Sequence, residues 1–395
     1  MSEDKKKLTL FEASSVVAGL GIGGGVMATP YLASLNGIVP IISILLFAYL
    51  ISVLFHLMIA EMVIRDGGNL QLVELFGKYL FRGKGGVFFT WIFFASIVIG
   101  FYSLLAGYIV GCGEVLVEVF KASSIPLLAG LPLWVGELIT YAVAAGVIYF
   151  GIKGLGVSEK YAVIGIILLL IVLSVGSFGR PFNTLSLFTV GTKQSLALYG
   201  MAMFSFAVFF SIPQAVEGLS WNRKMVSWAV AIGLGITLCS VLIITVMAML
   251  VSGKVTEVAL LGWGDAVGKW HLLLGSLFGF LAMLTSYWGV SYALAVIVKE
   301  RLGWGDRTSW LCATLPTLLL AVTGVSGFLG FMRIVGGAMA VLVAILIVPA
   351  YRISMRQESV GEPEFTLGFW GNNYFQLIII IAYLLMAIGS VVPVK

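Results

Sequence analysis

The sequence predicts an all-α membrane protein in which eleven helices cross the bilayer and two of them, the first and the sixth, are interrupted. Hydrophobic residues make up 60% of the 395 residues, charged residues make up 10%, and the mean hydropathy is +1.09. A soluble domain cannot bury that much apolar surface. The apolar runs are about 20 residues long, which favours helices over the shorter alternating strands of a β-barrel.

The predicted spans are the apolar runs of membrane-crossing length. They cover residues 11–34, 38–63, 86–119, 133–150, 160–178, 194–219, 226–251, 270–299, 309–325, 331–353 and 374–393. We expect residues 1–395 to form a single transmembrane domain. Its first five-helix repeat would cover 11–178, its second 194–353, and an additional helix 374–393.

Basic residues set the expected orientation. Lys and Arg concentrate in the amino-terminal segment and in the loops that follow the second, fourth, sixth, eighth and tenth spans. Cytoplasmic loops carry the excess of positive charge. We therefore expect a multi-pass protein of the cytoplasmic membrane, with the amino terminus inside and the carboxyl terminus outside. The net charge of +5 serves this orientation and does not indicate nucleic-acid binding.

The first span contains the stretch GLGIGGGVMATP at residues 19–30. Inside a helix, Gly costs about 1 kcal/mol and Pro about 3 kcal/mol relative to Ala, so this stretch predicts a break. The sixth span has a second interruption, MFSFAVFFSIPQAVEGL at 203–219, where Pro213 removes a helical donor. Breaks five spans apart are typical of two inverted five-helix repeats that each supply a discontinuous helix to a midplane site.

Unwound backbone at membrane depth needs polar partners. The N–H groups that open a half-helix attract a carboxylate, and free carbonyls attract an ammonium group or a metal ion. Gly23, Gly24 and Gly25 leave the backbone open to a ligand, and a zwitterionic amino acid offers both charges. Close packing at small residues, or a proline kink, would explain either stretch alone. Both stretches in corresponding positions favour a binding site.

Three segments resemble the amino acid–polyamine–organocation superfamily of transporters. They are IGGGVMATP at 22–30, FSFAVFFSIPQAV at 204–216 followed by NRK at 222–224, and LTSYWGVSYALAVIVKERLG at 284–303. A weaker match is AEMVIRDGGN at 60–69, which is similar to the end of the superfamily's second helix. Within the superfamily, the chain looks most like the hydroxy and aromatic amino acid permease branch, which is related to the auxin/amino acid permeases.

The resemblance implies the inverted-repeat fold of bacterial leucine, arginine and tyrosine transporters, with alternating access around helices 1 and 6. By position, the N–H groups of Gly24 and Gly25 would bind the substrate carboxylate. Carbonyls near Gly21 and around Ser205 and Phe206 would bind the ammonium group, and the Phe206 ring would act as a lid.

The pocket for the side chain of the substrate is expected to involve residues of the third and sixth spans. The branch's sixth helix often has a His near the position of Phe209, and this chain does not. Tyr102, near the middle of the third span, and Phe209 suggest an apolar pocket, although aromatic rings at helical spacing also pack in cores. We expect a neutral, apolar or aromatic amino acid, because no charged residue is placed to match a charged side chain.

A candidate sodium site lies in the eighth span. Ala282, Thr285 and Ser286 share one helix face because they are spaced at i, i+3 and i+4. One carbonyl and two hydroxyls make a neutral oxygen cage for a hard cation. The resemblance to sodium symporters adds the carbonyls of Gly19 and Ile22. Hydroxyls that merely bond to the preceding turn are the alternative interpretation.

Proton coupling is the rival hypothesis. Some proton-driven relatives place a lysine in the fifth helix where sodium would sit, whereas the fifth span, written as YAVIGIILLLIVLSVGSF, contains no charged residue and has Lys160 at its edge. Ionisable groups within spans are functional candidates by default. His56 and Glu114 lie clearly inside spans and are the proton-coupling candidates.

The expected partners are an amino acid substrate, a coupling cation and the lipid bilayer, with no other cofactor. Cys112, Cys239 and Cys312 fall within spans at no metal-like spacing, and His56 and His271 belong to different spans. An enzyme would need a nucleophile–base pair or paired carboxylates at membrane depth, and the sequence offers no such constellation. A membrane amino acid sensor or a channel on the same fold stays open as an alternative to a symporter.

Overall fold

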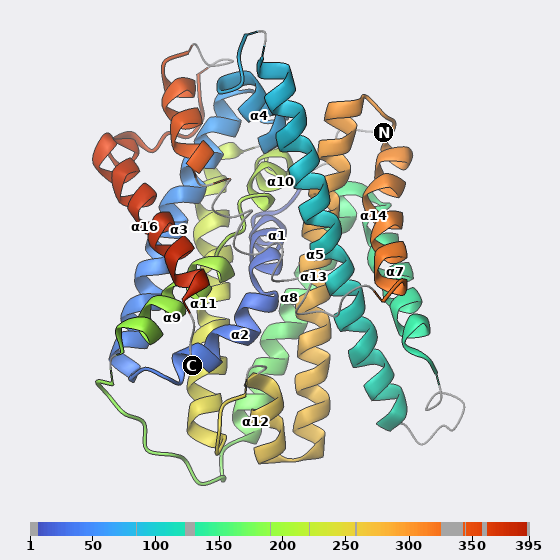
Figure 1. The fold of residues 1–395 in the computed structure, drawn as a ribbon, viewed down its shortest axis with the longest axis vertical. Coiled ribbons are helices and arrows are strands. Elements are labelled where there is room, and N and C mark those ends of the chain that lie inside the picture. Colours follow the sequence, from blue (N-terminus) through green and yellow to red (C-terminus); the bar gives the residue numbers. More distant parts are fainter. Residues whose placement is uncertain are drawn as a thin grey trace.

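The computed structural model describes residues 7–83, 85–122, 131–189, 191–220, 222–256, 259–324, 343, 345–357 and 362–392. Within these ranges every regular element is a helix, which confirms the all-α prediction. The helices form an elongated bundle, with the short helix α4 at one end and α12 at the other (Figure 1).

The helix bounds follow the predicted spans closely, with two spans divided into pairs of helices. The helices are α1 (Leu10–Gly21), α2 (Gly24–Ala33), α3 (Ile38–Arg65), α4 (Leu72–Tyr79), α5 (Gly86–Ala122), α7 (Leu133–Ile148), α8 (Gly151–Gly176), α9 (Thr192–Ser205), α10 (Ser211–Gly218), α11 (Val226–Val251), α12 (Ala259–Val267), α13 (Lys269–Leu302), α14 (Asp306–Val322) and α16 (Asn373–Val391). Short 3-10 turns lie at Arg223–Met225 and Gly368–Gly371, and a further apolar helix covers Ile345–Met355.

Six described helices are long and apolar enough to cross a membrane, and the bent pair α1–α2 makes a seventh candidate. The other predicted spans correspond to shorter helices or to the α9–α10 pair. Most of the tenth predicted span, 331–353, lies outside the described residues. The total of eleven spans therefore stays a prediction.

The fifth predicted span begins too late. Helix α8 starts at Gly151 rather than at residue 160, so Lys153, Glu159 and Lys160 are all helical. The apolar run alone suggested the later start. The helix carries charge beyond that run because Lys153 and Lys160 pair with Glu12 of α1, at Nζ–Oε distances of 2.7 and 3.4 Å.

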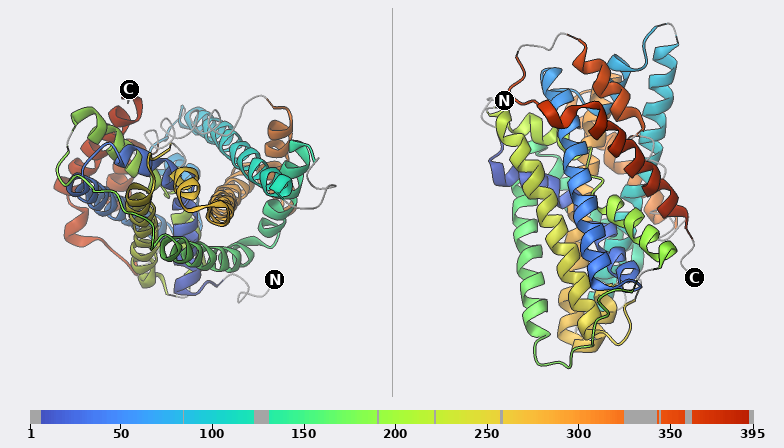
Figure 2. Two further views of the ribbon diagram at one scale, coloured as in Figure 1. Left: turned by 90° about the horizontal axis from the view of Figure 1, so that it is seen from below. Right: turned by 90° about the vertical axis from the view of Figure 1, so that its left-hand side faces the viewer.

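Helix α1 occupies the centre of the bundle. Helix α1 packs against α8, α10, α11 and α13, while α3 and α16 lie to one side and α7 and α14 to the other (Figures 1 and 2). Of the most apolar 18 residues of α13, 83% are buried inside the protein, against 33% for the corresponding residues of α3 and of α16. Helix α13 is therefore a central wall of the bundle, and α3 and α16 are peripheral.

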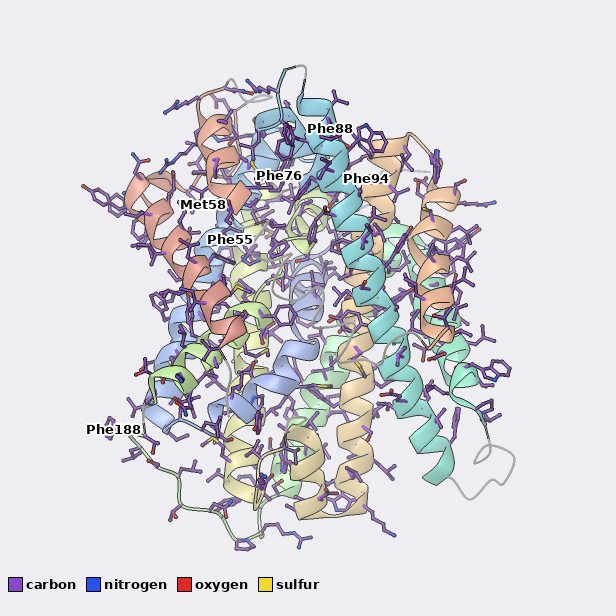
Figure 3. The ribbon with its side chains drawn as sticks, in the orientation of Figure 1. Phe55, Met58, Phe76, Phe88, Phe94 and Phe188 are labelled. Atoms are coloured by element: carbon purple, nitrogen blue, oxygen red, sulfur yellow. The ribbon has the colours of Figure 1, made fainter. Side chains whose placement is uncertain are left out.

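Large apolar side chains point outward as well as inward. Phe55, Met58 and Phe76 are fully buried, whereas Phe88 and Phe188 are 65% and 72% exposed (Figure 3). Such a surface would be costly in water, but it suits a protein whose solvent is lipid.

Candidate functional site at the two helix breaks

The first break separates α1 from α2 by Ile22 and Gly23, and the two helices are inclined by 59° to each other. The N–H group of Ile22 still donates to the carbonyl of Ala18 at 2.8 Å and closes the last turn of α1. Gly24 and Gly25 then open α2. The first amides of a helix have no acceptor within it, so the predicted break presents free N–H groups at this point.

The glycines of this region also allow other helices to approach. A Cβ atom at alternate glycines would lie between 1.9 and 2.6 Å from a side-chain oxygen of another helix: Gly19 near Glu159 of α8, Gly21 near Thr237 of α11, Gly23 near Ser286 of α13, and Gly25 near Ser205 of α9. A substitution at any of these glycines would therefore require the neighbouring side chain to move. The stretch therefore serves close packing and backbone exposure together, so the two interpretations of the sequence are not exclusive.

The second break runs from Phe206 to Phe210, between α9 and α10. It is held by His56 of α3, which is fully buried. Its Nε2 accepts a hydrogen bond from the Val208 N–H at 3.1 Å, and its Nδ1 lies 2.5 Å from the Ser52 carbonyl. Because Nε2 acts as an acceptor, the ring carries its proton on Nδ1 and is neutral in this arrangement.

The two breaks meet in space. The Thr29 hydroxyl of α2 lies 3.1 Å from the Ser205 hydroxyl at the end of α9, and it donates to the Gly25 carbonyl at 2.7 Å. On the other side, a Cβ atom at Gly21 would lie 3.2 Å from Cγ1 of Val208. The structure thus brings together the predicted residues Gly21, Gly23, Gly24, Gly25 and Ser205.

Aromatic rings line the second break. Phe206 is fully buried and meets Tyr49 edge-on, with ring centroids 6.3 Å apart. Phe209 stacks on His56 at 6.4 Å and contacts Phe210 at 5.0 Å. An imidazole thus lies beside Phe209, supplied by α3.

Tyr102 does not join the breaks. Its hydroxyl donates to the Cys312 carbonyl of α14 at 2.8 Å. Tyr108, six residues further along α5, reaches the first break instead: its hydroxyl is hydrogen-bonded to Ser286 and lies 3.2 Å from the position of a Cβ at Gly23. Six residues turn a helix through about 240°, so these two tyrosines face different sides of α5. Sequence reasoning chose the tyrosine nearest the middle of the span and missed Tyr108.

Oxygen atoms of α1 and α13 converge beside the first break. The Thr285 hydroxyl lies 3.0 Å from the carbonyls of both Gly19 and Ala282, and the Ser286 hydroxyl lies 3.2 Å from the Gly19 carbonyl. Ile22 follows α1 directly at the break. The contact between Thr285 and Ala282 is the bond to the preceding turn that the alternative interpretation expects. The two contacts to Gly19 are additional, and this all-oxygen donor set fits a hard cation.

The two proton-coupling candidates lie apart. His56 contacts the second break, as described above. Glu114 of α5 is exposed, and the adjacent Gly113 packs against Glu137 of α7. A Cβ at Gly113 would lie 2.9 Å from both Cγ and the backbone nitrogen of Glu137. The structure therefore does not bring Glu114 to either break.

The start of α1 is held to its neighbours by hydrogen bonds and ion pairs. The N–H group of Leu8 donates to the Gly218 carbonyl of α10 at 2.8 Å, which ties the start of α1 to the end of α10. Thr9 and Glu12 form a capping box, and Glu12 also pairs with Lys153 and Lys160. These contacts tie the start of α1 to α8 and α10.

Comparison with known proteins agrees with this architecture. The model of the tryptophan/tyrosine permease family matches residues 6–390. No curated protein sequence shows significant similarity to this chain.

Two of the similar solved structures are transporters. Mhp1, a nucleobase-cation-symport-1 family transporter in a closed conformation with bromovinylhydantoin bound, has a TM-score of 0.66 and 14% identity, covering 96% of this chain and 90% of that one. MhsT in complex with L-phenylalanine has a TM-score of 0.63 and 16% identity, covering 97% of this chain and 99% of that one. The leucine-transporter-like fold is thereby confirmed.

Proposed function

We propose that this chain, which belongs to the tryptophan/tyrosine permease family, imports a neutral aromatic amino acid across the cytoplasmic membrane together with Na⁺. The family and the fold establish that the protein is a multi-pass secondary transporter of amino acids and not an enzyme. The substrate, the ion and the direction are the proposal.

The meeting of the two breaks carries the proposal. Gly24 is partly exposed, although Gly23 and Gly25 on either side of it are buried. A substrate carboxylate at the N–H groups of Gly24 and Gly25 would complete the open end of α2, where the helix dipole favours negative charge. The Tyr108 hydroxyl, 3.2 Å from the position of a Cβ at Gly23, would donate to the same carboxylate. Carbonyls at Gly21, Ser205 and Phe206 would then receive the ammonium group.

The surroundings of the second break favour an aromatic side chain. Phe206, Phe209 and Val208 supply apolar surface there. Aromatic rings stack or meet edge-on with favourable energy beyond simple burial. The name of the tryptophan/tyrosine permease family and the L-phenylalanine bound to MhsT point in the same direction.

Sodium is the proposed coupling ion because the Thr285 and Ser286 hydroxyls both reach the Gly19 carbonyl. This contact joins the cation ligands of α13 to the broken helix that holds the substrate. A cation bound there would fix α1 against α13 and favour the form that binds the amino acid. Protons remain the competing ion, with His56 and Glu114 as their carriers.

Uptake by the purified protein in liposomes tests the proposal. Labelled alanine, serine, leucine, phenylalanine, tyrosine and tryptophan would be offered under an inward Na⁺ gradient and, separately, under an inward proton gradient. We expect uptake of the aromatic substrates with Na⁺ alone, and its loss in Thr285→Ala and Ser286→Ala. Uptake driven by protons alone would contradict sodium coupling, and uptake of alanine and serine in preference to the aromatic substrates would contradict the proposed pocket.

A further inference from the structure

Glu159 is a fully buried carboxyl group on α8, with no exposed surface. Neither of its carboxyl oxygens has a hydrogen-bond partner among the described residues. An ionised carboxylate in such a place is strongly disfavoured unless a cation accompanies it. A buried carboxyl group without a hydrogen-bond partner among the described residues is therefore a candidate for binding a cation.

The lysines nearest to Glu159 in sequence do not neutralise it. Lys153 and Lys160 both direct their ammonium groups to Glu12, at 2.7 and 3.4 Å. Glu12 also caps the start of α1, so both lysines belong to the ion-pair cluster at that end of the helix. Glu159 is left facing α1 without a hydrogen-bond partner among the described residues.

The position of Glu159 connects it to the first break. Its Oε2 lies only 1.9 Å from where a Cβ atom of Gly19 would be, so the carboxyl group fills the space that this glycine leaves. The carbonyl of Gly19 is the atom approached by both Thr285 and Ser286. Three helices, α1, α8 and α13, thus place oxygen atoms around a single peptide unit.

A second unpartnered oxygen lies on the same face of α1. Ser15 precedes Gly19 by four residues, which places the two one above the other on the helix. Its side chain is fully buried, and its hydroxyl has no hydrogen-bond partner among the residues that the structure describes. Ser15 and Glu159 therefore offer free oxygen atoms where α1 passes α8.

We propose that the Glu159 carboxylate is part of the cation site and supplies its negative charge. The site then combines neutral oxygens from α1 and α13 with one carboxylate from α8. A monovalent cation and Glu159 together carry no net charge, so cation binding removes the penalty of an isolated buried carboxylate. This inference rests on the proposed coupling to a cation and adds to it a residue that the sequence analysis had placed before the fifth span.

Thermal unfolding of the purified full-length protein tests the role of Glu159 without relying on transport. The melting temperature would be measured in NaCl and in KCl at equal ionic strength, since an ion that binds only the folded state raises it. We expect a Na⁺-specific rise in the unchanged protein and its loss in Glu159→Gln. Glu137→Gln is the matched control, because Glu137 is a buried carboxyl on α7 that lies away from both breaks.

Glu159→Asp keeps the carboxylate but moves it back by one methylene. This variant tests the role of the carboxylate even if Glu159→Gln does not fold. We expect the aspartate variant to retain a Na⁺-specific rise with sodium affinity weakened by about tenfold, the loss typical of a perturbed metal site. If Glu159→Gln keeps the full Na⁺-specific rise while Thr285→Ala loses it, the inference about Glu159 is wrong and the neutral cage stands. If the unchanged protein shows no Na⁺-specific rise, both the sodium site and the role of Glu159 are wrong.

Discussion

The two helix breaks have the same architecture but are built from different chemistry. The break between α1 and α2 is made of glycines, and neighbouring helices bring oxygen atoms to within contact distance of its backbone. The break between α9 and α10 contains no glycine from Phe206 to Phe210. It is held instead by the His56 imidazole, which accepts the Val208 N–H, and by packed aromatic rings.

The difference shows how backbone can remain unwound in a membrane by two routes. At the first break, the amides of Gly24 and Gly25 open a helix and Gly24 is partly exposed, so a ligand that reaches them would stabilise the break when it binds. At the second break, a side chain of the protein occupies the exposed amide permanently, since an unpaired N–H group at this depth is costly. We infer that the first break supplies most of the charged recognition, whereas the second supplies a fixed, apolar wall.

Adding a methyl group to the first break is the strongest test of this comparison. In Gly25→Ala, the new Cβ would lie 2.5 Å from the Ser205 hydroxyl and 3.0 Å from the Ser205 Cα, and the latter is backbone that cannot rotate away. We expect uptake in liposomes to fall by roughly 100-fold, as for other ångström-scale misplacements at a binding centre. Gly146→Ala in α7 is the control, because no atom lies within 4 Å of its added methyl group.

Removing the imidazole tests the second break. His56→Ala leaves the Val208 N–H without its acceptor, which we expect to cost about 1–3 kcal/mol of stability and to reduce uptake. His271→Ala is the matched control: His271 is equally buried and contacts the Leu173 carbonyl, far from both breaks. If the two variants have similar melting temperatures but only His56→Ala loses uptake, the loss is due to the contact with the second break and not to lower stability. Full uptake by His56→Ala would contradict the role assigned to the histidine.

The two tyrosines of α5 sharpen the comparison. Tyr108→Phe removes the hydroxyl beside Gly23, and a hydrogen bond to a charged group is worth about 1.5–3 kcal/mol. We therefore expect the KM for the amino acid to rise about tenfold or more. Tyr102→Phe removes a hydroxyl that is hydrogen-bonded to Cys312 of α14, and it should leave the KM unchanged. Equal effects of the two substitutions would place the substrate elsewhere.

The smallest effect is expected outside both breaks. Lys153→Ala removes one of the two partners of Glu12, and the lysine side chain is 40% exposed. Exposed ion pairs contribute at most about 1 kcal/mol, and Lys160 remains to neutralise Glu12. We expect uptake to stay within about twofold of the unchanged protein, measured in the same liposomes. A larger loss would show that the ion pairs at the start of α1 affect transport more strongly than expected for contacts outside both breaks.

The sequence predicted the parts of the molecule whose chemistry is local. A run of glycines within an apolar span marks the first break without any knowledge of its neighbours. The i, i+3, i+4 spacing of Ala282, Thr285 and Ser286 likewise places these residues on one face of a helix. Pro213 marked the second break, although it lies within α10 rather than in the unwound segment.

The parts that sequence reasoning missed depend on contacts between distant elements. Helix α5 is apolar on all sides, so periodicity could not show whether Tyr102 or Tyr108 faces the centre. Glu159 was not considered, because it precedes the apolar run that begins at residue 160, whereas helix α8 starts at Gly151. The acceptor role of His56 depends on a residue 152 positions away. In each case the deciding information is the rotation or the start of a helix.

Competition for binding tests the central claim most directly, because recognition by bare backbone at the first break requires both charges of the zwitterion. Purified protein in Na⁺ would be incubated with labelled L-tyrosine and challenged with unlabelled L-tyrosine, with tyramine, which lacks the carboxylate, and with 3-(4-hydroxyphenyl)propionate, which lacks the amine. We predict that only L-tyrosine competes at comparable concentration. Competition by tyramine as strong as that by L-tyrosine would contradict the account, since the amides of Gly24 and Gly25 would then have no part in binding.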